Sequence, residues 1–292
     1  MTLIVDSGST KTDWCFLSHS NATLTIQTKG INPVVQSQEE IRQTIETELP
    51  NKARQEAINL NDVDKIHYYG AGCVADKTHI IVQMLRNVFL ENAEITVESD
   101  IMAACHALCG RREGMVCILG TGSNSCLYDG QQMTLHTPPL GFILGDEGSG
   151  AALGKIIVNA VFKRLLPEQL CQSFTEETRM QMSDIINNVY RQPSPNRFLA
   201  SLSQFAARHI DNPAIERLVI MNFEQFINNN LRQYTSSGAA PVINAIGSIA
   251  HYYSRQLQKA AENNGFTVGK ILKSPMSGLI EYYKMNPLAE LI

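Results

Sequence analysis

A polar loop between two apolar strands occurs twice in this chain, and the repetition constrains the fold more than any other feature. The first copy reads Asp6-Ser7-Gly8-Ser9-Thr10-Lys11-Thr12-Asp13, and the second reads Gly120-Thr121-Gly122-Ser123-Asn124. Each lies between runs that are rich in strand-forming residues and too short for helices, which predicts a tight turn in a β-hairpin. Because Ser7-Gly8-Ser9-Thr10 matches Thr121-Gly122-Ser123-Asn124, the sequence predicts a duplicated architecture with two similar lobes.

Both loops have the composition of a phosphate site. Glycine and small hydroxyl residues let the backbone approach a ligand closely, and successive N–H groups can form a nest that binds an anion. In the first loop Lys11 adds a positive charge, and Asp6 could hold a hydrated metal ion. An ordinary polar turn is the alternative for one loop alone, whereas two equivalent loops indicate two lobes that face one nucleotide. The order strand, loop, strand, without a second glycine before the lysine, excludes a Walker A loop and a dinucleotide fingerprint.

Asp100 is the candidate for chemistry. It follows a predicted strand, Glu94–Glu98, and precedes a predicted helix, Ile101–Leu108. Open α/β sheets place their ligand sites at such strand-to-helix junctions. The alternative is that Ser99 or Asp100 is only the helix N-cap, and both roles can hold at once.

Two further glycine-containing segments precede predicted helices. Asp146 and Glu147 lie within Gly145-Asp146-Glu147-Gly148-Ser149-Gly150, before a helix over Ala151–Phe162. The acidic pair could accept hydrogen bonds from a polyhydroxy ligand or complement the helix dipole; we favour the ligand, because a plain cap does not need so many glycines. Gly247-Ser248 follows the predicted strand Pro241–Ile246 and starts a helix to Glu262, where a flat ring or phosphate could approach the helix end.

Periodicity predicts the remaining elements. Strands are expected at 22–28, 65–69 and 267–272, helices at 37–49, 78–90 and 279–292, a helical region at 155–235 and a turn at Ser274–Gly278. Asn32 lies in a loop and is extended because Pro33 follows it.

Composition narrows the class of protein. A chain of 292 residues with 44% apolar and 18% charged residues is expected to be globular with two domains. A net charge of −4 without a basic run argues against nucleic acid as a partner, and no run approaches the length of a membrane span. The early strand interrupted by Asp6 argues against export, and seven scattered cysteines indicate reduced thiols in the cytoplasm. Cys105 and Cys109, one helical turn apart, are interpreted as buried residues, with cluster ligation as the alternative.

With these motifs in place, the chain resembles the sugar kinase, actin and Hsp70 superfamily, and within it the N-acetylglucosamine kinase group, which includes the BadF/BadG/BcrA/BcrD-type ATPases. The likeness covers essentially the whole chain. The two polar loops resemble the family's phosphate motifs, Gly145–Ser149 its sugar loop and Gly247-Ser248-Ile249-Ala250 its adenosine motif.

The resemblance implies an α/β fold with two RNase H-like lobes, each with a mixed five-stranded sheet, and a ligand cleft between them. The N-terminal lobe would span 1–112 with a returning C-terminal helix at about 279–292, and the C-terminal lobe would span 113–278. It also implies ATP and Mg²⁺ as cofactors, a small-molecule sugar as partner, and phosphate transfer to a hydroxyl, expected to be the 6-hydroxyl of N-acetylglucosamine.

By the same resemblance, Asp100 would be the catalytic base and Asp6 the metal residue. The nucleotide would contact Ser9, Thr10, Lys11, Gly120, Thr121, Gly122, Ser123, Gly247 and Ser248. The sugar would contact Asn32, Asp100, Gly145, Asp146 and Glu147.

Alternatives to this substrate and reaction remain open. Leu140 stands where relatives commonly have tryptophan, so glucosamine or a muramic-acid derivative is an alternative substrate. An activator ATPase that holds an Fe–S cluster between two subunits is an alternative reaction, for which Cys105 and Cys109 would be the ligands. A sugar sensor without catalysis is a third alternative, and the sequence leaves open whether the protein is a homodimer.

Overall fold

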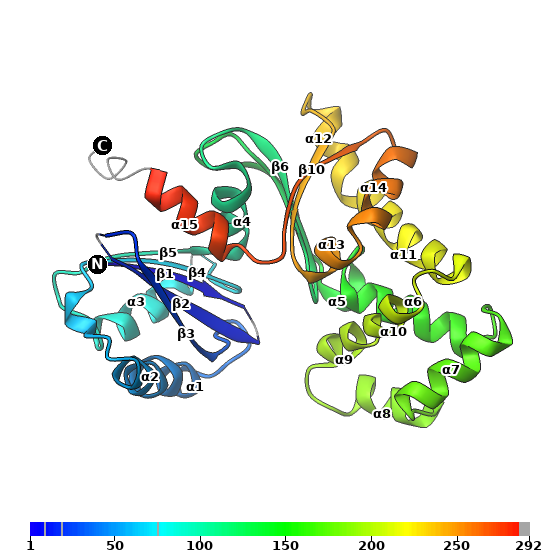
Figure 1. The fold of residues 1–292 in the computed structure, drawn as a ribbon, viewed down its shortest axis with the longest axis horizontal. Coiled ribbons are helices and arrows are strands. Elements are labelled where there is room, and N and C mark those ends of the chain that lie inside the picture. The colour runs from blue at the N-terminus through cyan, green and yellow to red at the C-terminus, as the bar shows by residue number, and fades with distance from the viewer. Residues whose placement is uncertain (9, 19, 75, 286–292) are drawn as a thin grey trace. The chain divides into compact units, whose positions relative to one another are not determined.

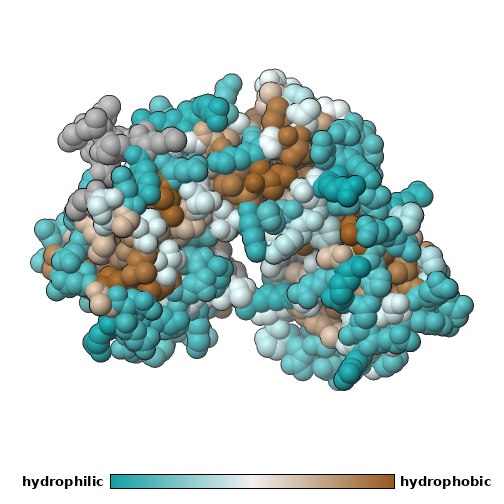
Figure 2. All heavy atoms as spheres, in the orientation of Figure 1, coloured by the Kyte–Doolittle hydropathy of each residue, from teal (hydrophilic) through white to brown (hydrophobic). Residues whose placement is uncertain are grey.

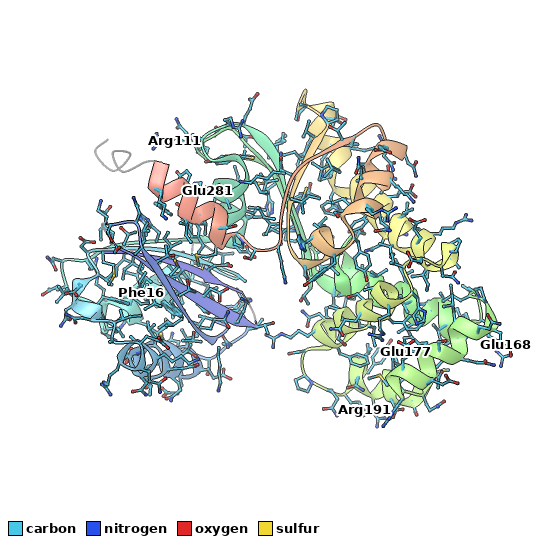
Figure 3. The ribbon with its side chains drawn as sticks, in the orientation of Figure 1. Phe16, Arg111, Glu168, Glu177, Arg191 and Glu281 are labelled. Atoms are coloured by element: carbon cyan, nitrogen blue, oxygen red, sulfur yellow. The ribbon has the colours of Figure 1, made fainter. Side chains whose placement is uncertain are left out.

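The chain divides into two compact units. The computed structural model describes residues 1–8, 10–18, 20–74 and 76–285. Unit 1 comprises Met1–Gly110 and the segment that begins at Pro275, and unit 2 comprises Arg111–Ser274 (Figure 1). Figure 3 labels Arg111, where the chain enters unit 2, and Glu281 on the helix that ends the described chain. Each unit has its own sheet and its own hydrophobic core.

The sheet of unit 1 has five strands in the order β3-β2-β1-β4-β5. The strands are β1 (Thr2–Ser7), β2 (Lys11–Leu17), β3 (Thr23–Lys29), β4 (Lys65–Gly70) and β5 (Glu94–Ser99). β1, β2 and β3 pair antiparallel, whereas β4 and β5 run parallel to β1. Leu3, Ile4 and Val5 are all fully buried, as expected for a central strand that is covered on both faces.

Helices cover this sheet and connect its strands. They are α1 (Gln38–Arg42), the π-helix Gln43–Glu48, α2 (Leu49–Gln55), the short 3₁₀ turn Leu60–Asp62, α3 (Thr78–Arg86), α4 (Asp100–Cys109) and α15 (Met276–Met285). The helical stretch predicted to end at Leu49 continues to Gln55, because Pro50 lies in the first turn of α2, where its missing N–H costs no hydrogen bond. Leu49 N–H donates to Thr44 O, five residues back, which is the π geometry.

The sheet of unit 2 repeats the pattern of unit 1. Its strands are β6 (Gly114–Leu119), β7 (Ser123–Tyr128), β8 (Met133–Thr137), β9 (Val242–Ile246) and β10 (Thr267–Leu272), in the order β10-β9-β6-β7-β8. β6, β7 and β8 pair antiparallel, and β9 and β10 add parallel strands beside β6. The predicted duplication, with a mixed five-stranded sheet in each lobe, is therefore confirmed.

Most of unit 2 beyond its sheet is helical. The helices are α5 (Gly141–Leu144), α6 (Gly150–Phe162), α7 (Glu168–Thr178), α8 (Met182–Tyr190), α9 (Pro195–Ser201), α10 (Ser203–Arg208), α11 (Pro213–Phe226), the π-helix Ile227–Leu231 (η3), α12 (Arg232–Ser236), α13 (Ser248–Tyr252) and α14 (Ser254–Asn263). The helix predicted to run unbroken from Gly247 to Glu262 is thus two helices, with a break at Tyr253.

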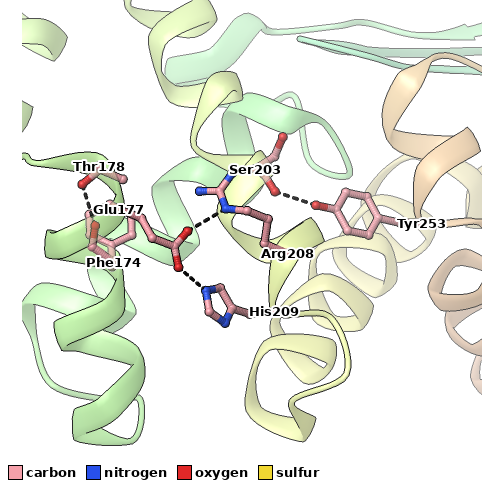
Figure 4. A network of polar contacts seen from close by, with 7 residues as sticks. All are labelled: Phe174, Glu177, Thr178, Ser203, Arg208, His209 and Tyr253. Atoms are coloured by element: carbon pink, nitrogen blue, oxygen red, sulfur yellow. Dashed lines mark hydrogen bonds and ion pairs between the residues drawn. The ribbon is translucent and has the colours of Figure 1, made fainter.

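Polar contacts tie the helices of unit 2 together. Glu177 on α7 accepts from Arg208 Nε at 2.6 Å and pairs with His209 Nε2 at 2.5 Å (Figure 4). The hydroxyl of Tyr253, at the break between α13 and α14, donates to Ser203 O at 2.6 Å. These contacts fix α7, α10 and the start of α14 with respect to one another.

Helix α15 packs on α4 within unit 1. The predicted turn at Ser274–Gly278 is wrong in its second half, because α15 begins at Met276. Gly278 lies so close to Ala107 of α4 that a Cβ at this position would clash with Ala107 O. The hydroxyl of Tyr283 then lies 2.6 Å from that of Tyr69 on β4, which fixes α15 to the sheet as well.

Hydrophilic side chains cover most of the visible surface of each unit (Figure 2). Among the residues that the structure describes, no helix combines the length and apolarity needed to cross a membrane.

Candidate active site

The carboxyl ends of the parallel strands in unit 1 bring the first set of candidate residues together. Ser7, Gly70 and Ser99 are successive neighbours across β1, β4 and β5. Asp6 is therefore next to the end of β1, and Asp100 begins α4 directly after β5. This edge is where open α/β sheets bind ligands.

Asp6 faces other carboxylates at this edge. It stands directly opposite Asp13 on β2. Burial, followed by the negative charges of Asp13 and Asp100, raises the pKa of Asp6 to about 7, against a smaller lowering by Lys11. A divalent cation would reverse this repulsion, and Mg²⁺ is commonly held by one or two carboxylates together with substrate phosphates. The donor set around Asp6 therefore fits the predicted Mg²⁺.

Lys11 is committed to Asp13 in this structure. Its Nζ lies 2.7 Å from Asp13 Oδ2, and Gln27 Nε2 donates to Asp13 Oδ1 at 2.6 Å. The turn itself is closed by a hydrogen bond from Gly8 N to Lys11 O at 3.0 Å. Lys11 is thus in place beside the predicted phosphate loop with its charge paired. Ser9, which was predicted to contact phosphate, lies outside the described residues; Thr10 is exposed at the tip of the hairpin.

Asn32 is held beside the first hairpin. The buried Ser7 Oγ donates to Ile31 O at 3.1 Å and lies 2.8 Å from Thr12 Oγ1. Asn32 Oδ1 accepts from Val34 N at 3.0 Å, in an Asx turn that fixes the side chain. The loop after β4 also contacts the Asn32 side chain, because a Cβ on Gly72 would clash with Asn32 Oδ1. Asn32, Asp6 and Asp100 therefore gather at one edge of unit 1.

The N-cap alternative for this junction is only partly met. Ser99 occupies the N-cap position of α4 with an extended backbone, but its side chain makes no capping hydrogen bond. Asp100 is the first residue of the helix, so its carboxylate belongs to the edge that carries Asp6.

Unit 2 brings the second phosphate loop, the acidic pair and the late glycine motif together. The loop Gly120–Ser123 packs on the start of α6, because Gly150 N donates to Gly120 O at 2.8 Å and Ala151 N donates to Thr121 O at 3.1 Å. Gly247 has φ 126°, and a Cβ on it would clash with Leu119 O. Only glycine fits there. Ser248 follows as the first residue of α13.

Asp146 lies against the loop that holds Gly122 and Ser123. Its Oδ1 accepts from Ser123 N at 3.4 Å, and a Cβ on Gly122 would stand 3.0 Å from its Oδ2. Asp146 has a left-handed backbone, φ 59°, which turns the carboxylate toward this loop. Burial raises the pKa of Asp146, with Glu147 adding to the effect, while the Ser123 N–H and Lys155 oppose it.

Glu147, next to Asp146, is held by the π-helix η3 of unit 2. Its carboxylate accepts from Asn229 Nδ2 at 2.9 Å and from Asn230 Nδ2 at 3.4 Å, both on the π-helix η3. A pocket of about 210 Å³ is lined by Ser123, Asp146, Glu147, Asn229 and Asn230, among others. Gly145 also lines it, so the three residues of the predicted sugar loop share one cavity.

The sequence reasoning missed three residues of these sites. Asp13 was part of the first loop but had no role assigned, although its register opposite Asp6 would have suggested one. Asn229 and Asn230 belong to a run of three asparagines, Asn228–Asn230, inside a helical region. Asparagine is a poor helix former, so the run was a usable signal.

Cys105 and Cys109 are buried, with 0% and 7% of their surface exposed. Among residues 1–8, 10–18, 20–74 and 76–285, no group of three or more His, Cys, Asp or Glu is arranged to hold a metal. The geometry of α4 therefore presents these thiols to the protein interior.

The fold is similar to those of solved sugar kinases with little sequence identity to this chain. A glucokinase of the ROK family from Streptomyces griseus, solved with glucose and AMPPNP, matches with a TM-score of 0.52 at 12% identity over 97% of this chain and 98% of its own. A candidate N-acetylglucosamine kinase from Chromobacterium violaceum matches with a TM-score of 0.71 at 17% identity over 96% and 98%. The chain therefore has the two-lobe α/β fold of the sugar kinase and actin class.

A closer match gives the family. A candidate N-acetylglucosamine kinase from Porphyromonas gingivalis matches with a TM-score of 0.90 at 42% identity, over 99% of this chain and 100% of its own. The chain belongs to the N-acetylglucosamine kinase family of sugar kinases. No family model matches the sequence, and no curated protein matches it.

Proposed function

We propose that this protein transfers the γ-phosphoryl group of ATP to an amino sugar, with N-acetylglucosamine as the substrate and N-acetylglucosamine 6-phosphate as the product. One observation carries the proposal: Asp6 and Asp100 lie at the carboxyl ends of the parallel strands of unit 1, and Asn32 packs against Gly72 in the loop that follows one of them. This gathering supports a site in which a carboxylate binds metal, an amide binds a hydroxyl and a second carboxylate serves as base. The 42% identity to the Porphyromonas protein supports the same reaction class.

Asp100 acts as the general base. It accepts the proton of the sugar hydroxyl as the oxygen attacks the γ-phosphorus, and the bond from the γ-phosphorus to the bridging oxygen of ADP breaks. General base catalysis of this kind contributes roughly 10²–10⁴-fold. The remainder comes from positioning and from stabilisation of charge on the transferred group.

The phosphates are held by backbone and side-chain groups of both hairpins. Thr10 and Lys11 contribute from the first loop, Gly120, Thr121, Gly122 and Ser123 from the second, and Gly247 and Ser248 bind the nucleoside. Ser9 is assigned to the same role from its motif. Mg²⁺ would be held near Asp6 and would supply the charge neutralisation that phosphoryl transfer needs. Lys11 must share its charge between Asp13 and the phosphates.

The sugar is oriented by hydrogen bonds. Asn32 and Asp100 in unit 1, and Asp146 in unit 2, bind its hydroxyls, with the two carboxylates as acceptors, and Gly145 and Glu147 line the pocket of unit 2 beside Asp146. Leu140, which is 61% exposed, lines the same pocket and offers an aliphatic contact.

All seven cysteines are free thiols, which is consistent with the cytoplasm as the location.

A coupled assay of ADP release tests the proposal. Hexoses, hexosamines and their N-acetylated forms are screened at fixed ATP and Mg²⁺, with the Asp100→Asn variant as the control, because it keeps the shape of the side chain and removes the base. N-acetylglucosamine is expected to stimulate ADP release in the natural protein and to do so at least ~100-fold less in the variant. The proposal is wrong if no sugar raises ADP release above the level of the variant.

A further inference from the structure

The acidic residue Glu147 lines a pocket that contains both apolar and polar residues. Leu140, Leu144, Pro138 and Pro139 are its apolar residues, and Asn124, Thr137, Asn229, Asn230 and the acidic pair are among its polar residues. The volume of about 210 Å³ is large enough for part of a sugar ring and one substituent, and too small for a nucleotide. The polar residues are therefore the ones that can distinguish related sugars by their hydrogen bonds.

Two amides fix the carboxylate of Glu147. Asn229 Nδ2 and Asn230 Nδ2 donate to different oxygens of the group, at 2.9 and 3.4 Å. An ionised carboxylate has about four acceptor positions, so two amide donors leave acceptor capacity for a ligand. Both asparagines come from the π-helix η3, and π segments are frequent at functional sites.

The wall that carries these amides is itself fixed. Thr137 Oγ1 donates to Asn230 O at 2.9 Å, which joins the end of β8 to η3. The hydroxyl of Tyr234, which is 1% exposed, accepts from Thr137 N at 2.9 Å and donates to Ser125 O at 2.9 Å. The π-helix cannot shift without breaking contacts in the core of unit 2, so the position of Glu147 is pre-organised.

We propose that Asn229 and Asn230 are positioning residues that hold Glu147 as the acceptor for one O–H or N–H donor of the sugar, so that this kinase selects substrates that carry a donor at that position. The inference rests on the proposed function and deepens it, because it assigns discrimination between related amino sugars to one carboxylate and its two supports. A site built to bind a donor rejects an analogue that lacks it, because the carboxylate would lose water without gaining a partner.

A substrate-truncation cycle tests the role of Glu147. The sugar that gives the highest kcat/KM is compared with its single-deoxy analogues at each position other than the phosphate acceptor, and with the analogue whose amide nitrogen is methylated. In the natural protein, one analogue is expected to lose about 100-fold in kcat/KM. In Glu147→Ala the same analogue should lose less than about 5-fold, and Glu147→Gln, which keeps one carbonyl acceptor, should restore part of the discrimination.

Variants of η3 separate positioning from a structural role. Asn229→Ala and Asn230→Ala are expected to reduce the discrimination against that one analogue by about 5- to 10-fold, mainly through KM, while the other analogues keep their relative rates. Asn228→Ala is the matched control, because Asn228 lies in the same π-helix and its Oδ1 accepts from Arg232 Nε at 2.7 Å instead of contacting Glu147. It should leave all the ratios unchanged.

Two results would overturn the inference. One is an analogue penalty of equal size in the natural protein and in Glu147→Ala, which would place the donor elsewhere. The other is an effect of the Asn229 and Asn230 variants that is uniform over all analogues, as a merely structural role predicts. Calorimetric binding of the same sugars is measured in parallel, so the inference is still tested if no sugar is phosphorylated, in which case the proposed kinase function fails separately.

Discussion

The sharpest physical prediction concerns His67 in the core of unit 1. Its side chain is 8% exposed, its ring stacks on Tyr283 with centroids 4.1 Å apart, and its Nδ1 lies 2.9 Å from Thr96 Oγ1. Burial, with smaller effects of Lys65 and His106, lowers the pKa of His67 from 6.5 to about 4. The imidazole is therefore neutral in the folded protein over most of the acid range.

The sign of the stability effect follows from proton binding. Below its ordinary pKa of about 6.5 the unfolded state binds a proton at His67, whereas the folded state does not until the pH approaches about 4. The stability associated with the neutral ring is fully present above pH 6.5 and is lost as the pH falls through this window. At pH 5 the loss is about 2 kcal/mol, and near pH 4 it approaches ~3 kcal/mol, because a tenfold difference in proton affinity between the two states is worth about 1.4 kcal/mol.

The assay is urea unfolding followed by tyrosine and tryptophan fluorescence from about pH 4.5 to 7.5, for the natural protein and for His67→Gln. Other groups titrate in the same range, so the measured quantity is the difference between the two proteins in the free energy of unfolding. The variant loses the ring contacts at every pH, but its curve should be flatter by about 2 kcal/mol between pH 7.5 and pH 5. Parallel curves would refute the burial argument, because they would show that His67 binds protons equally in both states.

Three other substitutions test specific contacts. Gly247→Ala should destabilise unit 2 by about 3 kcal/mol, because the backbone angle is strained for alanine and the new Cβ clashes with Leu119 O. Both the Tm and the affinity for ATP should fall. Gly278→Ala should cost about 1–3 kcal/mol by forcing α15 away from Ala107, measured as a lower Tm, and an unchanged Tm would show that the helices separate freely. Glu177→Gln should cost about 0.5–1 kcal/mol at low salt and less in about 0.5 M NaCl, since its pairs are partly exposed; a salt-independent effect would contradict the ion-pair account.

The two hairpins could be predicted from the sequence, because the residues that form each of them are close together in the chain. Strand formers, a glycine and small hydroxyl residues are adjacent in the chain, so one short window contains the turn and its neighbours. The central strands were equally visible, since Leu3-Ile4-Val5 is a continuous apolar run that a covered strand explains. Repetition then predicted two similar lobes, and the resemblance to sugar kinases implied a mixed five-stranded sheet in each.

The parts that the sequence did not reveal depend on exposed or distant residues. β8 was missed because the alternation of Met133-Thr134-Leu135-His136 covers only four residues, and all four are exposed on this edge strand. The start of α15 was missed because Gly278 is typical of a turn, whereas its use is close approach to α4. The contact of Glu147 with Asn229 joins residues 82 positions apart, and no local sequence pattern can predict such a contact.

The duplicated sheets have diverged in the chemistry that their hairpins offer. In unit 1 burial, followed by the negative charges of Asp13 and Asp100, raises the pKa of Asp6 to about 7. In unit 2 the equivalent hairpin offers glycines and backbone groups, and its nearest carboxylate, Asp146, accepts from Ser123 N. Accumulated negative charge suits a cation and the removal of a proton, whereas backbone N–H groups suit phosphate oxygens. Under the proposed function, the carboxylates of unit 1 would serve the metal and the base, and the backbone groups of unit 2 would add to phosphate binding, which are roles that phosphoryl transfer requires.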